Sequence, residues 1–374
     1  MPESFEVLII GAGIVGTACA RELAAGGVSV GLVERDVVGS GATAAGMGHI
    51  VVMDDSPPQL ALTRYSQVLW NAFAKEAPPT HEYTRCGTIW VAEDDEEMHA
   101  VHDKHAVYQA QDVPCEILGI HALSNLEPNL RPGLAGGLLV PEDSVVYPPG
   151  SAALLLDRAR RQGARLLCGT VTAVVPGGVQ LASGAELRAG AVVLANGARA
   201  VDLAPGLPIR AKKGHLAITD RYPGFVRHQL VELGYIKNAH ATDGDSVAFN
   251  VQPRGTGQVL IGSSRQFDAP SDACDHGILS QMLHRAFAYL PTLAQLSCLR
   301  VWTGFRAATP DGLPLIGPHP DRHGLWLATG HEGLGITTAP ATAKLLAAQL
   351  LGYTPEIPIE PYLPERVSPE AIRA

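Results

Sequence analysis

Three glycines near the N-terminus have the spacing of a phosphate-binding turn. Gly11, Gly13 and Gly16 form G-x-G-x-x-G directly after the apolar run 7–10 and before an alanine-rich segment. In such a fingerprint turn the first glycine permits a tight bend, the second admits a pyrophosphate, and the third packs a helix against a strand. The phosphates would lie at the positive end of that helix. The spacing predicts a dinucleotide site, with an ordinary glycine-rich turn as the alternative.

Glu34 stands where a dinucleotide-binding unit needs an acidic residue. It follows a second apolar run and comes 18 positions after Gly16. A carboxylate at this place accepts hydrogen bonds from a ribose hydroxyl pair. Because it would repel a 2′-phosphate, the sequence disfavours NADP.

Two further glycine-rich segments favour FAD over NAD. Residues 39–48 offer small side chains and free N–H groups for a second approach to a pyrophosphate and a flavin. Residues 329–337 offer a third and lead into a helix, whose N-terminus would face the anionic edge of a flavin. Each segment alone is equally consistent with a simple loop. Together with the fingerprint turn they predict FAD.

Arg306 is an arginine whose side chain is able to bind a carboxylate. It lies in Gly304-Phe305-Arg306, shortly before Thr309-Pro310-Asp311-Gly312. A guanidinium binds a carboxylate through two parallel charge-assisted hydrogen bonds. The alternative is a structural arginine that pairs with a neighbouring acid such as Asp311.

These motifs, in this order, resemble those of the D-amino acid oxidase-like flavoenzymes, which include glycine oxidase, sarcosine oxidase and the D-amino acid dehydrogenases. The resemblance covers nearly the whole chain. Residues 45–50, 52–55 and 330–336 are most similar to the FAD-containing catalytic (β-type) subunit of D-hydroxyproline dehydrogenase.

The resemblance implies roles for particular residues and partners. It implies that Arg306 holds the substrate carboxylate on the face of the flavin. In covalent sarcosine oxidases a cysteine near this segment bonds to the flavin, whereas here the nearest, Cys298, precedes Arg306 by eight residues. We therefore expect non-covalent FAD. The subfamily likeness further implies a hetero-oligomer, in which electrons pass to partner subunits carrying FAD or iron–sulfur centres.

Other candidates stand outside a complete motif. His49 follows the second glycine segment and is a catalytic candidate beside Arg306, while His331 lies in the third segment. A lone histidine is equally able to be a packed or surface residue. Tyr147 and Tyr235 are candidates for the substrate cavity.

The residues predicted to contact FAD come from all these segments. They are Gly11, Gly13, Ile14, Val15, Gly16, Glu34, Arg35, Gly41, Ala42, Thr43, Ala45, Gly46, Met47, Gly48, His49, Val171, Ala195, Asn196, Gly197, Arg306, Gly330, His331, Gly333, Leu334, Gly335, Ile336 and Thr337.

The expected reaction is oxidation of the Cα–N bond of a small amino acid, in particular a cyclic or secondary D-amino acid similar to D-hydroxyproline or D-proline. Hydride transfer to flavin N5 would give an imine, and no strong side-chain base is needed if the amine enters unprotonated. Three alternatives remain open: a glycine or sarcosine type of oxidase, a 2-hydroxy acid dehydrogenase that needs a histidine base, and a flavin subunit that only relays electrons.

Composition excludes several other classes of protein. The formal charge of −9 and the lack of a basic run argue against nucleic acid. The six cysteines form no C-x-x-C and no zinc-like spacing with histidine, so no metal is expected. The N-terminus lacks a signal-peptide pattern and no apolar run approaches the roughly 20 residues that span a bilayer. We expect a cytoplasmic protein without a membrane span.

The elements that must position these residues follow from periodicity and from glycine punctuation. Strands are expected at 7–10, 28–33, 88–92, 136–140, 191–195, 215–219, 246–251, 258–262 and 325–329, and helices at 15–25, 60–75, 93–111, 151–162 and 339–351. Strand-to-glycine junctions at Gly11, Gly197 and Gly330 lie at the beginning, middle and end of the chain. A nucleotide-binding sheet built from segments so far apart must have other material inserted between them.

We therefore predict a mixed α/β and α+β fold, with a Rossmann-like FAD-binding domain and an inserted substrate domain on a mostly antiparallel sheet. The expected FAD-binding domain comprises residues 1–85, 145–212 and 300–365. The expected substrate-binding domain comprises 86–144 and 213–299, and 366–374 form a C-terminal tail.

Overall fold

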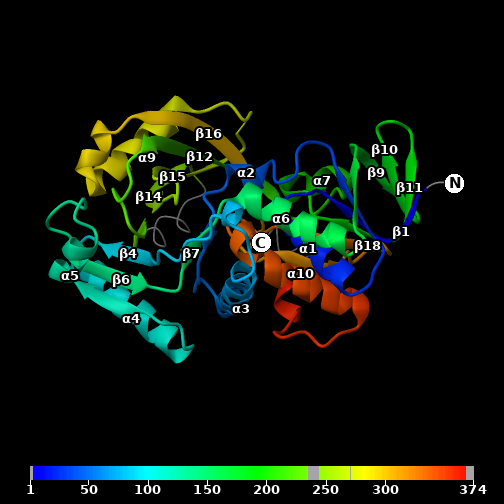
Figure 1. Cartoon of the computed structure of the whole chain (residues 1–374), viewed down its shortest axis with the longest axis horizontal. Coiled ribbons are helices and arrows are strands. Elements are labelled where there is room, and N and C mark those ends of the chain that lie inside the picture. The colour runs from blue at the N-terminus through cyan, green and yellow to red at the C-terminus, as the bar shows by residue number, and fades with distance from the viewer. Residues whose placement is uncertain (1–2, 235–243, 270, 368–374) are drawn as a thin grey trace.

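The computed structural model describes residues 3–234, 244–269 and 271–367. Two eight-stranded sheets lie toward opposite ends of the long axis (Figure 1). The first sheet has the order β17-β18-β11-β1-β2-β8, with β10 beside β11 and β9 beside β10. Its strands are β1 (Ser4–Ile10), β2 (Val30–Glu34), β8 (Arg165–Cys168), β9 (Val171–Val175), β10 (Gly178–Leu181), β11 (Glu186–Leu194), β17 (Leu315–Pro318) and β18 (Leu325–Thr329).

The three predicted strand-to-glycine junctions meet at the carboxyl-terminal ends of neighbouring strands in this sheet. Strand β11 lies between β1 and β18 and is parallel to both. Ile10 is in register with Leu194, and Leu194 with Leu327. The segments that follow these strands therefore emerge side by side. Segments from the start, middle and end of the chain build one sheet, which confirms the predicted Rossmann-like architecture.

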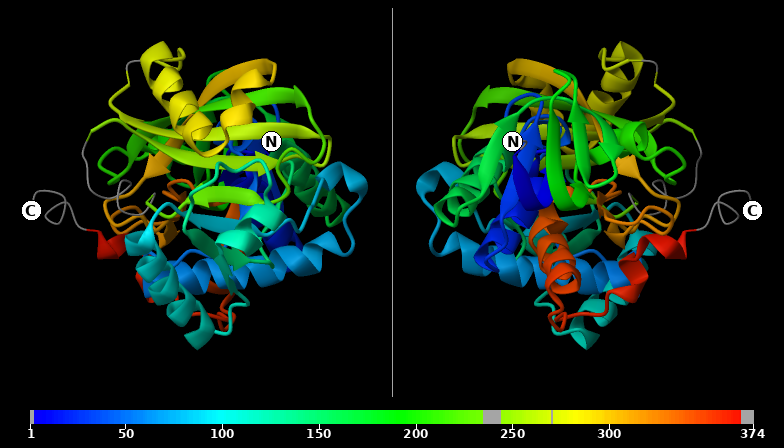
Figure 2. Two further views of the ribbon diagram at one scale, coloured as in Figure 1. Left: turned by 90° about the vertical axis from the view of Figure 1, so that its left-hand side faces the viewer. Right: turned by 90° about the vertical axis from the view of Figure 1, so that its right-hand side faces the viewer.

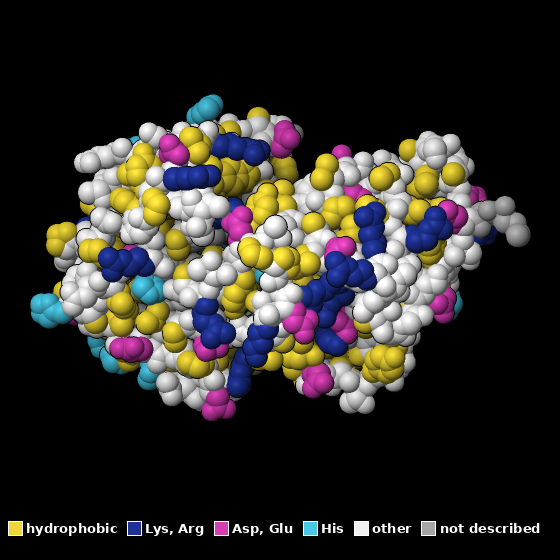
Figure 3. Space-filling view, in the orientation of Figure 1, with side chains coloured by type: hydrophobic (Ala, Val, Ile, Leu, Met, Phe, Trp, Pro, Cys, Tyr) yellow, Lys and Arg dark blue, Asp and Glu magenta, His cyan; other side chains and the backbone are white. Residues whose placement is uncertain are grey.

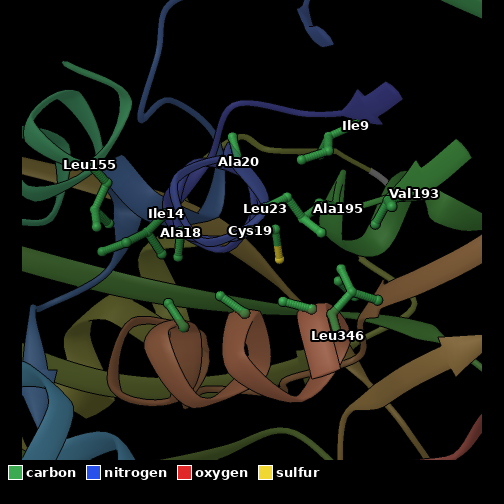
Figure 4. Packing of buried hydrophobic residues seen from close by; sticks show 14 of the residues in the cluster. Ile9, Ile14, Ala18, Cys19, Ala20, Leu23, Leu155, Val193, Ala195 and Leu346 are labelled. Carbon is green, nitrogen blue, oxygen red and sulfur yellow. The ribbon is translucent and has the colours of Figure 1, made fainter. Parts of the chain in front are cut away.

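Helices cover one face of the first sheet. They are α1 (Ile14–Ala25), α3 (Pro57–Ala74), α6 (Pro148–Arg161) and α10 (Gly335–Leu351). Figure 4 shows α1 against α10, with Cys19 and Leu346 in the shared core. Burial raises the pKa of the Cys19 thiol to about 12, so this cysteine packs as an apolar residue. The opposite face is covered by the β9–β10 hairpin and the short α7 (Ala200–Leu203).

The second sheet is mostly antiparallel, as predicted. Its order is β16-β12-β15-β14-β13-β4-β6-β5, and among these described strands only the β13–β4 pair is parallel. Helix α9 (His276–Tyr289) covers its outer face, as the left panel of Figure 2 shows. The strands are β4 (Thr88–Ala92), β5 (Glu116–Gly119), β6 (Gly136–Val140), β12 (Arg210–Arg221), β13 (Gln229–Glu232), β14 (Ser246–Pro253), β15 (Gln258–Phe267) and β16 (Cys298–Ala308).

Smaller elements complete the described part of the chain. The predicted loop 39–48 contains one helical turn, α2 (Ala42–Ala45). A two-stranded sheet joins β3 (His49–Ile50) to β7 (Ser144–Val145), while α4 (Asp95–Ala110) and α5 (Ile120–Leu126) flank β4 to β6. The domain boundaries stay predictions. Strands β12 and β16 each cross one of them and belong wholly to the second sheet.

Charged side chains are mixed on the face shown in Figure 3, where most Lys and Arg groups lie near Asp or Glu. The ion pair of Arg158 with Glu76, at 3.4 Å, is an example. Within the described residues, no helix has the length and apolar character needed to cross a membrane. The same residues contain no group of three or more His, Cys, Asp or Glu side chains that could hold a metal ion.

Candidate active site

The fingerprint turn has the close contacts that its glycines predict. Gly11 has a φ of +102°, and a Cβ there would lie 2.9 Å from the carbonyl oxygen of Ala195. A Cβ at Gly16 would lie 1.9 Å from the carbonyl oxygen of Gly11. Strand β1, strand β11 and helix α1 thus approach more closely than a side chain allows. Ile14 and Val15 begin α1 directly behind this turn.

The second glycine segment lies against the N-terminus of α1. The Ile14 N–H donates to Oγ1 of Thr43 at 3.0 Å. A Cβ at Gly13 would come within 3.1 Å of the same oxygen. Thr43 therefore satisfies one of the unpaired N–H groups at the start of the helix. Gly41 and Ala42 adjoin Thr43, so the structure brings the two predicted phosphate-binding segments together.

Glu34 is tied to the fingerprint turn by its own carboxylate. Its Oε2 accepts from the Ala12 N–H at 2.7 Å, and its Oε1 accepts from the Asp36 N–H at 2.9 Å. The side chain is buried at the end of β2. Glu34 thus has a structural function in addition to the predicted ribose contact. Arg35 is exposed and pairs with Asp36 at 3.1 Å.

The middle junction lies beside the fingerprint turn. A Cβ at Gly11 would come within 2.9 Å of the Asn196 Cα. The Thr329 hydroxyl donates to the Gly197 carbonyl at 3.0 Å, which links this junction to the third. Val171 opens β9, two residues after Gly169, whose N–H donates to the Glu34 carbonyl at 2.8 Å. The structure therefore places Val171 near the end of β2.

The third glycine segment meets the second. The indole N–H of Trp70 donates to the Thr337 carbonyl at 2.9 Å, and the Thr337 hydroxyl donates to the His49 carbonyl at 2.8 Å. A Cβ at Gly46 would lie 2.5 Å from Cδ1 of Ile336. Helix α10 starts at Gly335, four residues before its predicted start. Leu334 is its N-cap residue, and Gly330, with a φ of +80°, begins the turn.

The segment 45–49 also touches the second sheet. Trp302 of β16 donates its indole N–H to the Ala45 carbonyl at 3.4 Å, and Gln252 of β14 donates to the Met47 carbonyl at 2.7 Å. A Cβ at Gly48 would lie 2.1 Å from the Val146 carbonyl oxygen. This segment therefore lies between the two sheets.

Arg306 lies on β16 with its guanidinium over the backbone of β12. Its Nη1 donates to the Ser264 carbonyl at 2.9 Å. A Cβ at Gly214 would lie 2.7 Å from that Nη1, so glycine leaves the space that the guanidinium occupies. Asp311, the alternative partner, forms a bidentate ion pair with Arg366 at 2.8 and 3.1 Å. Within the described chain, no carboxylate forms an ion pair with Arg306 within 4.0 Å.

A buried acid beside Arg306 was not predicted. Glu332 pairs with Lys212 at 2.6 Å. Burial raises the pKa of Glu332, but the positive charges of Arg306, Lys212 and Arg265 outweigh burial and hold this pKa at about 2. Glu332 stands between His331 and Gly333, so its place inside the third glycine segment could have marked it as a site residue. Lys212 lies in no motif, so the sequence did not mark it.

The two candidate histidines are neutral at physiological pH. Burial lowers the pKa of His49 to about 4, although the Gln252 side chain opposes the shift. Its Nε2 is buried without a hydrogen-bond partner among the described residues. Burial lowers the pKa of His331 to about 3, and its Nε2 is bonded to Oγ1 of Thr342 at 3.0 Å.

The two candidate tyrosines receive no structural support. Tyr147 is exposed, and the Arg254 guanidinium lies 4.7 Å from its ring centroid. Nothing in this position marks Tyr147 as a cavity residue. Tyr235 lies outside the described residues.

The residues present fit FAD. The glycines of the fingerprint turn let the backbone approach closely at the N-terminus of α1, where the Thr43 hydroxyl lies against Gly13 and Ile14. Beside this turn, Oδ1 of Asn196 is a buried polar atom without a partner in the described chain, as expected where a polar ligand completes the hydrogen bonding. The predicted FAD contacts stay predictions, and the structure brings the glycine segments together at the carboxyl-terminal ends of β1, β11 and β18.

Known proteins match this chain over almost its whole length. The family model described as FAD dependent oxidoreductase (DAO) matches residues 6–349. The glycine oxidase of Pseudomonas aeruginosa is 30% identical over 391 residues, which cover 96% of this chain and 99% of that protein. The glycine oxidase of Geobacillus kaustophilus is 29% identical over 366 residues, which cover 93% of each.

Solved structures share the fold. The crystal structure of the glycine oxidase from Geobacillus kaustophilus has a TM-score of 0.87 and 27% identity, and the match covers 98% of this chain and 100% of that one. The L-proline dehydrogenase from P. horikoshii also has a TM-score of 0.87, at 24% identity, covering 98% of each chain.

A Rossmann-like sheet joined to a second, mostly antiparallel sheet, with three glycine segments meeting beyond β1, β11 and β18, is the architecture of a flavin-dependent oxidoreductase. The chain belongs to the DAO family of FAD dependent oxidoreductases. It is an FAD-dependent oxidoreductase, and its relatives include the glycine oxidases described above.

Proposed function

We propose that the substrate is a small cyclic or secondary D-amino acid, of the D-hydroxyproline or D-proline type. The observation that supports substrate binding is the guanidinium of Arg306, which donates to the Ser264 carbonyl and has no carboxylate partner of its own in the described chain. Arg306 lies near Glu332, which already has Lys212 as its ion-pair partner. The positive charge of the Arg306 guanidinium favours binding of a substrate carboxylate.

The chain orients the substrate and does not take its proton. Arg306 would hold the carboxylate through a planar fork, which fixes the direction of the Cα–H bond. When bound, FAD supplies the hydride acceptor of the reaction. His49 and His331 stay neutral and therefore add no positive charge that would repel the ammonium group of an amino acid. That ammonium group must lose its proton before the Cα–N bond is oxidised.

The same histidines disfavour oxidation of a 2-hydroxy acid. That reaction needs a base to take the hydroxyl proton, and an efficient base has a pKa near the working pH. Burial holds the pKa of His49 at about 4 and that of His331 at about 3. Activity that survives substitution of both histidines would support amino acid oxidation.

Glycine or sarcosine oxidation is the second candidate function. The glycine oxidases of Pseudomonas aeruginosa and Geobacillus kaustophilus, each about as long as this chain, support it. The likeness of residues 45–50, 52–55 and 330–336 to the D-hydroxyproline dehydrogenase subunit supports the cyclic substrate instead. The two candidates share Arg306 and differ in the size of the group that the cavity must accept.

An anaerobic panel of amino acids, measured by bleaching of the flavin absorbance, tests the proposal. The panel contains D- and L-proline, 4-hydroxy-D-proline, D-alanine, glycine and sarcosine. Fastest bleaching by the cyclic D-amino acids supports the proposal, and fastest bleaching by glycine or sarcosine supports the second candidate. A flavin that no amino acid of the panel bleaches would contradict both candidates and favour a 2-hydroxy acid substrate or an electron-relay role.

We further propose that the electrons leave through partner subunits carrying FAD or iron–sulfur centres. The same subfamily likeness supports this. Turnover of the isolated chain with an artificial dye but not with oxygen is the expected result. Hydrogen peroxide formed at the rate of substrate oxidation would show that the chain is an oxidase.

A further inference from the structure

One side of the second sheet faces the glycine segments. On β14, Phe249 and Val251 pack into the core beneath α9. Successive side chains of a strand point to opposite faces, so Asn250 and Gln252 lie on the other side. The bond from Gln252 to the Met47 carbonyl, at 2.7 Å, shows that this side meets residues 45–49.

Arg306 lies on the same side of the sheet. Trp302, Gly304 and Arg306 alternate along β16. The indole N–H of Trp302 reaches the Ala45 carbonyl, and a Cβ at Gly304 would lie 2.3 Å from Cβ of Ala45. We call this side of β12, β14, β15 and β16 the inner face.

Asn250 places an unused hydrogen-bond acceptor on the inner face. The residue is 7% exposed, and its Oδ1 is buried without a hydrogen-bond partner in the described chain. The Gln252 side chain, two residues along the same face of β14, is hydrogen-bonded to the Met47 carbonyl and to His49. Buried polar atoms are normally paired, so the unpaired Oδ1 of Asn250 indicates a polar ligand on this face.

Asn250 and Arg306 are suitably placed to bind two ends of one small molecule. The Arg306 guanidinium is bonded to Ser264 of β15. Asn250 is on the adjacent strand, in register with Gly262, two residues before Ser264. With strands about 4.8 Å apart and about 3.4 Å per residue along a strand, Asn250 lies on the order of 8 Å from Ser264 along the sheet. That span suits an amino acid bound between a guanidinium and an amide.

We propose that Asn250 is a second substrate-binding residue, whose Oδ1 accepts a hydrogen bond from a donor group of the amino acid that Arg306 holds by its carboxylate. The donor is the substrate amine or a ring hydroxyl. The assignment rests on the proposed function, because it takes Arg306 as the carboxylate site.

The chemistry of an amide suits a Cα–N oxidation. Two-point binding fixes the rotation of the substrate about its carboxylate and therefore the direction of the Cα–H bond. A carboxylate in place of the amide would stabilise the protonated amine, which cannot be oxidised. The neutral amide accepts a hydrogen bond without that penalty. Asn250 therefore binds the substrate and leaves the amine free to lose its proton.

Two unreactive ligands of the same shape test the inference without turnover. Pyrrole-2-carboxylate has a ring N–H, whereas 2-furoate has a ring oxygen that cannot donate. Their dissociation constants for the FAD-loaded enzyme are measured from the change in flavin absorbance. If Asn250 binds the amine position, the native enzyme prefers pyrrole-2-carboxylate by about three- to tenfold, the effect of one neutral hydrogen bond, and Asn250→Ala loses that preference.

The ring hydroxyl is tested with D-proline and 4-hydroxy-D-proline. If Asn250 binds the hydroxyl, Asn250→Ala raises the KM of the hydroxylated substrate by a similar factor and leaves that of D-proline unchanged. Asn129→Ala is the matched control, because the Asn129 amide already donates to the Phe225 carbonyl at 2.7 Å. FAD content should equal that of the native enzyme in both variants.

Four results would overturn the inference. The first is an Asn250→Ala variant that keeps the native ligand preference and the native KM ratio. The second is loss of FAD by this variant alone, which would make Asn250 a cofactor-binding residue. The third is that neither pyrrole-2-carboxylate nor 2-furoate binds the native enzyme, which would also contradict the proposed carboxylate site at Arg306. Native binding of both carboxylates with equal affinity in every variant, together with an unchanged KM ratio, would overturn only the role of Asn250.

Discussion

At the scale of single residues, Glu34 combines a structural function with a predicted cofactor contact. Glu34→Ala removes the acceptor of the buried Ala12 N–H and the predicted acceptor of the ribose hydroxyls. The unpaired N–H should cost about 1–3 kcal/mol of unfolding free energy even without FAD. FAD affinity should fall about tenfold to a hundredfold. Thermal melting of the apoprotein and FAD titration measure the two effects separately.

Glu34→Gln is the matched control for this prediction, since its amide oxygen still accepts from Ala12. It should restore most of the apoprotein stability and only part of the FAD affinity. An apoprotein whose melting temperature is unchanged in Glu34→Ala would rule out the structural function. Unchanged FAD affinity in both variants would place the ribose elsewhere.

Arg306 allows a test at the same scale. Arg306→Ala should lose several kcal/mol of transition-state stabilisation, because binding and orientation of the substrate are lost together. Arg306→Lys keeps the charge but loses the planar fork, so it should also be impaired. Steady-state kinetics with free amino acids and with their amides measure the effect. Amides lack the carboxylate charge and should discriminate little between native and variant.

FAD content is the control for the Arg306 variants. The carboxylate of Glu332 keeps Lys212 as its partner when Arg306 is removed, so the fold around the site should persist. A variant that keeps full activity on free amino acids, or that simply loses FAD, would show that Arg306 is structural.

Single residues also show what sequence can predict of this site. The fingerprint glycines were predicted because their spacing along the chain carries the signal, and Arg306 because its segment resembles a segment of the flavoenzyme family. Lys212 and Asn250 were not predicted, because strand pairing places each of them in the site. Lys212 pairs with Arg306 across β12 and β16, and Asn250 pairs with Gly262 across β14 and β15. The Tyr147 candidate stays a prediction, since an aromatic residue outside a motif says nothing of which side of an element it occupies.

At the scale of elements, a buried acid connects helix α3 to the segment that follows β3, the strand that contains His49. Asp143 is fully buried, and its Oδ1 accepts from the Val52 N–H at 3.2 Å and from Nε2 of Gln67 at 2.9 Å. It thereby links the segment after β3 to α3 at the start of β7. Burial raises the pKa of Asp143 to about 7, although hydrogen bonds and Lys104 oppose the shift.

This pKa predicts how stability depends on pH. In the unfolded chain Asp143 loses its proton near pH 3.8, and in the folded protein near pH 7. Between these values the folded state binds more protons, so this group makes stability fall as the pH rises. Asp143→Asn keeps an acceptor for Val52 and Gln67 and does not titrate. It should therefore unfold at higher denaturant concentration than the native protein at pH 8, and the difference should shrink toward pH 5.

Chemical denaturation from pH 5 to 8 measures this difference. Asp157→Asn is a suitable control, since Asp157 is an exposed residue that pairs with Arg161 on α6. A difference between native and Asp143→Asn protein that does not change with pH would contradict the prediction.

Elements show where periodicity succeeds and fails. Strands β4, β6 and β18 have the predicted bounds, because each is a short apolar run that ends at a change of composition. Four-residue strands such as β13 and β17 were missed, since their character comes from pairing. Helix α3 starts at Pro57, three residues before its predicted start, and Ser56 caps it by accepting from the Gln59 N–H. Serine before proline is a start signal that the sequence contained.

At the scale of the whole molecule, the architecture places a cofactor where distant segments meet. The junctions after β1, β11 and β18 adjoin because these strands are neighbours in one sheet. The long insertions between them supply the second sheet, which carries Arg306 and Asn250. The separation of the junctions along the sequence was therefore enough to predict an inserted domain. It could not predict which inserted strands face the flavin, because that depends on how the second sheet is oriented.

The last prediction concerns FAD itself, which we expect to be bound tightly but without a covalent bond. Cys298 is exposed at the start of β16, and the fully buried Cys19 lies in the core between α1 and α10, so neither is placed for a flavin linkage. Acid precipitation should therefore leave the yellow colour in the supernatant and a colourless pellet. Because FAD would bind segments from the beginning, middle and end of the chain, it should stabilise the folded protein as a ligand does, by RT ln(1 + [FAD]/Kd), or about 2.7 kcal/mol at a hundredfold excess over Kd. Melting temperature should thus fall on removal of FAD and rise again with added FAD, whereas ADP should restore only part of the increase. Colour that stays in the pellet would refute non-covalent binding, and a melting temperature independent of FAD would refute the idea that the cofactor joins these segments.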